Sequence, residues 1–188
     1  MGNVVLDMTM SLDGCIAGPN DNDGGLHNWY FAASNDATGR SRQVIDEIMQ
    51  TIGAMIMGRR AYDIGAMHDG FVDNPYNVPH FVLSHTVPTT PAKGTTEFIF
   101  VHDGIESALE QAQAVVGAKD VCIAGGADLA QQYIKAGLLD EIQIHLVPVL
   151  LGGGSRLFDH LGSERIELEQ TRVIEGSGVT HLRYRVVK

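Results

Sequence analysis

The sequence has few cysteines and a single tryptophan among its 188 residues. Cys15 lies in a loop-like segment and Cys122 in an apolar run, and two such cysteines do not form a disulfide framework. The sequence also does not begin with a basic segment followed by an apolar run, the pattern of a secretory signal. We therefore expect a protein of a reducing compartment, the cytoplasm.

Basic residues are scarce as well. Thirteen Lys and Arg residues stand against 23 Asp and Glu residues, which gives a formal net charge of −10. This charge repels polyanions, so we expect neither nucleic acid nor an anionic membrane as a partner. An anionic small molecule would have to be held by a local group of donors.

Several catalytic and metal-binding motifs are absent. The eight histidines include no H-E-x-x-H and the cysteines no Cys-x-x-Cys, so no metal site is expected. A G-x-S-x-G motif is also missing, which argues against a serine hydrolase. The glycine run in 151–156 lacks the spacing of a dinucleotide fingerprint or a phosphate loop, and we expect a structural bend there.

What the sequence does contain is an alternation of strands and helices up to Ala136, followed by strands alone. Apolar runs and helical spacing predict strands at 4–10, 54–57, 80–84, 97–101 and 121–124, helices at 36–50 and 105–116 and from Leu129, and late strands at 141–150, 165–174 and 179–187. This order predicts an α/β fold with a mixed, mostly parallel sheet flanked by helices and a C-terminal antiparallel hairpin. With 44% hydrophobic residues, residues 1–188 are expected to form one domain.

Three of the predicted strands end in residues that can bind phosphate. These ends are Gly58-Arg59-Arg60, Ser84-His85-Thr86 and Gly125-Gly126-Ala127-Asp128. The carboxyl ends of parallel strands share one edge of a sheet, and two of these ends lead into helices, whose first N–H groups attract anions. The arrangement suits a phosphorylated dinucleotide such as NADPH, although the glycine pair alone could be a compact strand-to-helix turn.

Two further residues can be interpreted in two ways. Asp7 is a carboxylate within an apolar strand, so it either accepts hydrogen bonds from neighbouring backbone or faces a ligand pocket. Trp29 belongs to an aromatic cluster beside the loop-like segment 18–25, so it either packs in the core or stacks on a planar heterocycle.

The chain resembles the reductase domain of riboflavin biosynthesis, within the dihydrofolate reductase superfamily. The resemblance covers nearly the whole chain and rests on segments 11–14 (SLDG), 57–60 (MGRR), 124–126 (AGG), 137–142 (GLLDEI) and 148–154 (PVLLGGG). It implies a dihydrofolate reductase-like three-layer fold that binds NADPH and transfers hydride to a small heterocyclic or sugar-derived substrate. The late strands of the related reductases pair or pack against a second copy, so a homodimer is expected.

The resemblance also implies roles for individual residues. The residues implied for the cofactor are Thr9, Ile16, Ala17, Gly58, Arg59, Arg60, Ser84, His85, Thr86, Ala124, Gly125, Gly126, Ala127, Asp128 and Leu129. The residues implied for the substrate are Ser11, Asp13, Trp29 and Gly152. Asp7 is the candidate catalytic group, which would anchor a guanidine-like edge or relay a proton.

The implied activity resembles 5-amino-6-(5-phosphoribosylamino)uracil reductase. Two positions depart from that family, because Asp7 stands where a Lys is typical and Ala124 where a Glu is typical. Dihydrofolate reductases keep a carboxylate where this chain reads Arg40-Ser41-Arg42-Gln43. A dihydrofolate or pterin reductase and a non-catalytic NADP-binding sensor are therefore the alternatives.

Overall fold

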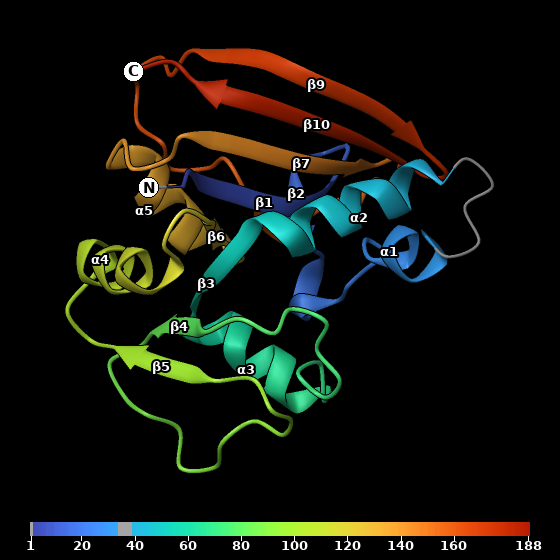
Figure 1. Ribbon diagram of the computed structural model, residues 1–188. Coiled ribbons are helices and arrows are strands. Elements are labelled where there is room, and N and C mark those ends of the chain that lie inside the picture. Colours follow the sequence, from blue (N-terminus) through green and yellow to red (C-terminus); the bar gives the residue numbers. More distant parts are fainter. Residues whose placement is uncertain (1, 34–38) are drawn as a thin grey trace.

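An eight-stranded sheet forms the centre of the computed structural model, which describes residues 2–33 and 39–188 (Figure 1). The strand order is β5-β4-β3-β6-β1-β7-β10-β9, in which the first six strands run parallel and β10 runs antiparallel to both of its neighbours, β7 and β9. A separate two-stranded sheet joins β2 to β8. The strands are β1 (Val4–Ser11), β2 (Cys15–Ala17), β3 (Ile52–Gly58), β4 (His80–Leu83), β5 (Phe98–Val101), β6 (Asp120–Ile123), β7 (Glu141–Val147), β8 (Ser155–Arg156), β9 (Leu168–Gly176) and β10 (Val179–Val186).

Helices cover both faces of this sheet. The helices are α1 (Asn28–Ala32), α2 (Arg40–Thr51), α3 (Arg59–Met67), α4 (Ile105–Val116) and α5 (Ala127–Lys135), with a short 3-10 turn η1 (Pro19–Asp21). Figure 1 shows α1 and α2 together in front of the sheet. The described residues contain no helix that is long and apolar enough to cross a membrane.

The central strands are apolar on both sides because both sides are covered. On one face, Leu6, Ile56 and Ile123 pack with residues of α4 and α5. Ile123 is fully buried there, and its truncation to alanine would cost about 2–5 kcal/mol. On the opposite face, Met55 and Cys122 pack against α2. Successive strand residues alternate between faces, so Asp7 and Thr9 of β1 lie on the α2 side.

The predicted fold class is confirmed, with differences at the ends of several elements. The strand predicted at 141–150 ends at Val147, before Pro148, which has no N–H for the ladder. The strand predicted at 165–174 begins at Leu168, where pairing with β10 begins. The predicted helix start at 36 lies outside the described residues, and α2 runs from Arg40 to Thr51.

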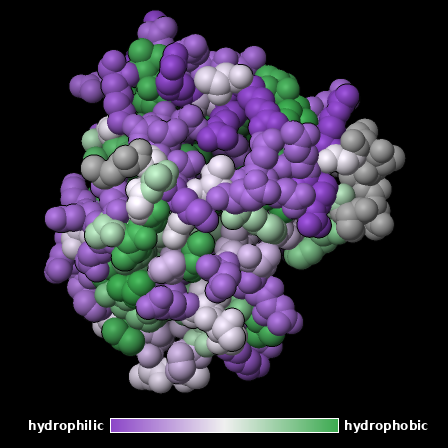
Figure 2. All heavy atoms as spheres, in the orientation of Figure 1, coloured by the Kyte–Doolittle hydropathy of each residue, from purple (hydrophilic) through white to green (hydrophobic). Residues whose placement is uncertain are grey.

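The surface seen in Figure 2 is mostly hydrophilic, with apolar residues gathered on the side where α4 and β5 lie. Val115 of α4 is one of the exposed large apolar residues. This side lies away from α2, where the polar groups described below are buried.

Candidate active site

A large cleft opens at the carboxyl ends of β3, β4 and β6 and extends to the α2 side of β1. Its volume is about 1770 Å³, compared with roughly 300–1,000 Å³ for pockets that hold one small ligand. The cleft therefore has room for two molecules side by side. Its position is where open α/β sheets bind their ligands.

Two helices begin at this cleft without a side-chain cap. The N-cap residues are Gly58 for α3 and Gly126 for α5, and neither helix receives a side-chain capping hydrogen bond. The first N–H groups of each helix therefore remain available at the positive end of the helix dipole. Gly58 N–H donates to Gly125 O at 2.8 Å, which holds the two helix starts together.

The glycine pair gives a ligand direct access to backbone. Gly125 has a φ of +133°, a conformation that favours glycine, and the Gly125–Gly126 peptide is cis. A Cβ on Gly126 would meet nothing within 4 Å, so that side of the turn is open. Because no side chain fills this space, a phosphate can approach the N–H groups of α5 closely.

Arg59 is fixed at the end of β4. Its Nη1 donates to Ser84 Oγ at 3.1 Å and to Thr86 O at 2.7 Å, and its Nε donates to Asp63 at 2.8 Å. The guanidinium is about one-third exposed and lines the cleft. A guanidinium held in this way binds an oxyanion with little loss of entropy.

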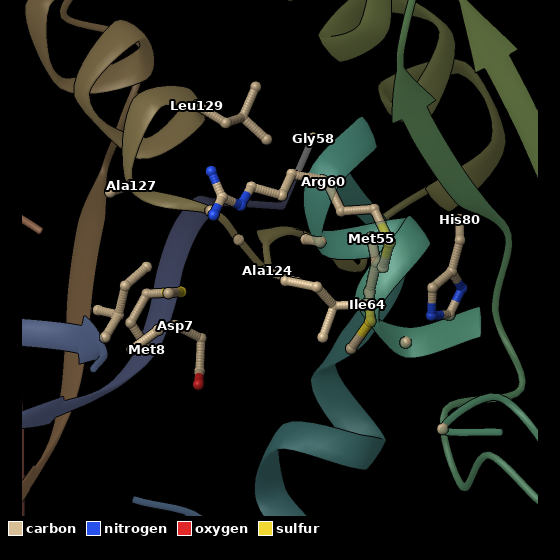
Figure 3. Close-up of a pocket in the computed structure, with 18 of the residues that line it drawn as sticks. Asp7, Met8, Met55, Gly58, Arg60, Ile64, His80, Ala124, Ala127 and Leu129 are labelled. Carbon is tan, nitrogen blue, oxygen red and sulfur yellow. The ribbon is translucent and has the colours of Figure 1, made fainter. Parts of the chain in front are cut away.

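Arg60 lies on the same helix turn and pairs with Asp21 of η1. Its Nη2 donates to both carboxylate oxygens of Asp21, at 2.8 and 2.9 Å. This bond is also the main reason that the pKa of Arg60 is raised. In Figure 3 the Arg60 guanidinium reaches from α3 into the space near Ala127.

Asp7 lines the part of the cleft that lies on the α2 side of β1. Gln143 Nε2 donates to its Oδ2 at 2.9 Å, and His145 Nε2 lies 3.1 Å from its Oδ1. The Asp7 side chain is 17% exposed, and it is among the residues that line the cleft in Figure 3. Asp7 thus lines the cleft and has side chains rather than backbone as its partners, and its contact with a ligand stays a prediction.

The negative charge of Asp7 contributes to the raised pKa values of two neighbouring groups, the Tyr76 hydroxyl and the Cys122 thiol. Burial raises the pKa of Tyr76, and the negative charge of Asp7 raises it further. Burial likewise raises the pKa of the Cys122 thiol, again with a contribution from Asp7. Both groups therefore stay protonated at neutral pH.

Trp29 packs in the core and also faces the cleft. It is 7% exposed and packs with Ala33 and Ile45, yet it also lines the cleft. Its Nε1 donates to Thr9 Oγ1 at 3.3 Å, and its ring lies 4.6 Å from that of His145. The ring is thus a fixed wall beside Asp7.

Three residues predicted at the substrate do not line the cleft. Asp13 accepts hydrogen bonds from Ser11 Oγ at 2.6 Å, from Leu151 N–H at 3.1 Å and from Gly152 N–H at 2.8 Å. These bonds join the turn after β1 to the glycine run, and they hold the pKa of Asp13 at about 2. The geometry gives Ser11, Asp13 and Gly152 a structural role, and their contact with substrate stays a prediction.

All residues predicted at the cofactor line the cleft. Sequence reasoning missed Gln143, His145 and Tyr76, which surround Asp7, and Arg156, which lines the cleft near α5. A polar residue in an otherwise apolar late strand was the available signal for Gln143 and His145. The described residues contain no cluster of His, Cys, Asp and Glu that could hold a metal ion.

The parallel sheet with a C-terminal antiparallel hairpin, together with a cleft at its strand ends, defines a dihydrofolate reductase-like domain. The RibD C-terminal domain model matches residues 3–182, and the chain belongs to this family. Reductases are among the solved structures that share this fold.

Three relatives illustrate the similarity. Protein YyaP of Bacillus subtilis (strain 168), itself uncharacterized, is 26% identical over 96% of this chain and 93% of its own length. The crystal structure of a Shewanella sp. PV-4 protein assigned to riboflavin biosynthesis is 27% identical, with a TM-score of 0.78 and full coverage of both chains. Dihydrofolate reductase from Enterococcus faecalis, solved with NADP(H), is 18% identical with a TM-score of 0.61, covering 100% of this chain and 98% of its own.

Proposed function

We propose that this protein is an NADPH-dependent reductase that transfers hydride to a small heterocyclic or sugar-derived substrate. The observation that carries the proposal is the convergence of two uncapped helix N-termini and the anchored Arg59 on one cleft that also contains Asp7. The first three groups suit the cofactor, and the carboxylate suits a substrate beside it.

The donor set fits a phosphorylated dinucleotide. The first N–H groups of α3 and α5 would bind the pyrophosphate, because the open space at Gly126 leaves them accessible. Arg59 would bind the 2′-phosphate, because Ser84 and Thr86 already fix its guanidinium at the neighbouring strand end. Thr9, Ile16 and Ala17 line the cleft between these groups and Asp7, where the nicotinamide would lie.

When bound, the nicotinamide supplies a hydride. The chain would supply the proton, because Asp7 lines the cleft on the same face of β1 as Thr9, where the nicotinamide would lie. Gln143 and His145 hold this carboxyl in place, and the ring of Trp29 packs against that of His145. The hydride donor and the acid would then act on adjacent atoms of one substrate.

Two substrate classes are supported. The similarity to a protein assigned to riboflavin biosynthesis favours an aminouracil related to 5-amino-6-(5-phosphoribosylamino)uracil. The carboxylate of Asp7 favours a ring edge that donates hydrogen bonds, as in a dihydrofolate or pterin. Turnover on both substrates separates them, and NADPH binding without turnover on either class would favour the sensor.

The cofactor assignment is tested by calorimetric titration with NADPH and NADH. We expect the wild type to bind NADPH at least tenfold more tightly. Arg59→Gln should lower the NADPH affinity about 10- to 100-fold, because hydrogen bonds to charged groups contribute about 1.5–3 kcal/mol, and should change NADH affinity little. Arg165→Gln removes an exposed arginine of the same charge outside the cleft lining and should leave both affinities unchanged. Equal affinity for both nucleotides, or none, would refute the proposal.

A further inference from the structure

A chain of buried polar side chains leads from Asp7 across the sheet to α2. His145 Nε2 lies 3.1 Å from Asp7 Oδ1, His145 Nδ1 lies 2.7 Å from His181 Nδ1, and His181 Nε2 lies 3.2 Å from Ser41 Oγ. The two histidines are directly paired residues of β7 and β10. Four elements that are far apart in the sequence therefore place one continuous chain behind the cleft.

Burial makes each of these hydrogen bonds important. The residues behind Asp7 are almost inaccessible, with exposed fractions of 2% for His145, 4% for His181 and 1% for Ser41. A buried donor or acceptor that loses its partner costs about 1–3 kcal/mol. The chain is therefore expected to adopt proton arrangements in which each contact joins one donor to one acceptor.

The contact between the two histidines limits these arrangements. Both atoms are Nδ1, and a hydrogen bond between them requires one nitrogen with a proton and one without. If Asp7 is ionised and both rings are neutral, His145 donates from Nε2, so its Nδ1 accepts from His181. His181 then accepts at Nε2 from Ser41. Both rings are neutral, and the donors all point toward Asp7.

The opposite arrangement satisfies the chain when Asp7 is protonated. The carboxyl then donates to His145 Nε2, His145 Nδ1 donates to His181, and His181 Nε2 donates to Ser41. Both rings are again neutral, but each has changed its tautomer. With both rings neutral, the geometry thus provides one complete hydrogen-bond pattern for each form of Asp7.

We propose that His145 and His181 are positioning residues that change tautomer together whenever Asp7 gains or loses its proton. The proposal rests on the proposed function only for the use of Asp7 as the acid. Starting from the ionised form, one proton enters at the Ser41 hydroxyl, and Ser41 passes its own proton to His181 Nε2. His181 passes its Nδ1 proton to His145, and His145 passes its Nε2 proton to Asp7. In the reaction the Asp7 O–H bond breaks, its electron pair stays on the carboxylate, and the proton bonds to the substrate.

Other ionisable groups around Asp7 do not take over this role. Tyr76 and Cys122 face it from the loop before β4 and from β6, and burial raises the pKa of each. Across a small cavity on its other side lie Asp120, Glu47 and Arg183. Arg183 pairs with Glu141, and the hydrogen bond from Arg172 lowers the pKa of Glu47.

The joint change of tautomer at His145 and His181 can be tested by NMR on the full-length protein without any ligand. In ¹⁵N-histidine-labelled protein, the nitrogen shifts show which ring atoms carry protons. At pH 8 we expect His145 protonated at Nε2 and His181 at Nδ1. On acidification both rings should exchange to the other tautomer in one step with one midpoint. His80 is an internal control, because it is buried and bonded to Val78 O, and burial lowers its pKa.

Variants make the test specific. Asp7→Asn should abolish the pH dependence of both tautomers, whereas Asp73→Asn, the same change at another acid of the cleft, should leave it intact. The wild-type titration decides the question even if Asp7→Asn does not fold. Doubly protonated His145 beside ionised Asp7, or separate midpoints for the two rings, would overturn the proposal. NADPH binding plays no part in this experiment, so its outcome is independent of the calorimetric test.

Discussion

Arg60 and Asp21 join α3 to the η1 turn across the edge of the cleft, with Nη2 2.8 Å from Oδ2. A phosphate bound at the start of α3 would compete with Asp21 for this guanidinium. We therefore predict that Asp21→Asn raises NADPH affinity about two- to fivefold, since exposed ion pairs contribute roughly 0.2–1 kcal/mol. Calorimetry at low and high salt measures the gain, which should shrink as salt increases.

Asp23→Asn is the matched control for that experiment. It removes the same charge from the same loop, but Asp23 pairs with His27 rather than with Arg60. A similar gain in NADPH affinity in both variants would show that the overall negative charge of this loop, and not the Arg60–Asp21 pair, opposes NADPH binding.

Substitution of Gly126 tests whether a phosphate approaches the first N–H groups of α5 closely. Its φ of −90° is accessible to alanine, and a Cβ there would meet no protein atom within 4 Å. Gly126→Ala should therefore lose at most about 1 kcal/mol of unfolding free energy, as expected for alanine at an N-cap. The methyl group would occupy the space that a phosphate needs, so NADPH affinity should fall at least tenfold. Chemical denaturation and calorimetry on one sample check both expectations, and undiminished affinity would exclude a phosphate at this turn.

Local patterns in the sequence predict that the ends of β3, β4 and β6 meet at one edge of the cleft. Gly58, Ser84 and Gly125 each follow an apolar run, and parallel strands necessarily bring their ends to one edge. Trp29 and Asp7 were recognised for similar local reasons, a ring beside a loop and an acid in a strand.

The surroundings of Asp7 could not be predicted in the same way. His145 and His181 meet because β7 and β10 pair in one particular register, and no local pattern determines this register. The resemblance implies a substrate role for Asp13, but its partners Leu151 and Gly152 lie 138 and 139 residues away, so no local pattern reveals the hydrogen bonds that occupy it. The expected homodimer stays a prediction.

Asp13 should make stability depend on pH in the acid range. Its pKa is lowered from 3.8 to about 2 in the folded protein, mainly by the bond from Ser11 and those from Leu151 and Gly152. The unfolded chain thus binds the proton first, and the stabilisation is complete above about pH 4 and lost as pH falls toward 2. We predict a shallower acid decline for Asp13→Asn than for the wild type in urea unfolding between pH 5 and 2. Glu164→Gln, which removes an exposed carboxyl, should decline like the wild type.

Gly176, at the end of β9, leaves the space in which Ser41 meets His181. A Cβ on this glycine would lie 2.3 Å from Ser41 Oγ and 3.1 Å from His181 Nε2. Gly176→Ala should therefore push the hydroxyl away and cost about 1–3 kcal/mol of unfolding free energy, through crowding and a weakened hydrogen bond. Ser41→Ala removes the crowded oxygen, so the double variant should be more stable than the sum of the single effects predicts. Chemical denaturation of the four proteins gives this coupling, and strict additivity would show that Gly176 and Ser41 do not constrain one another.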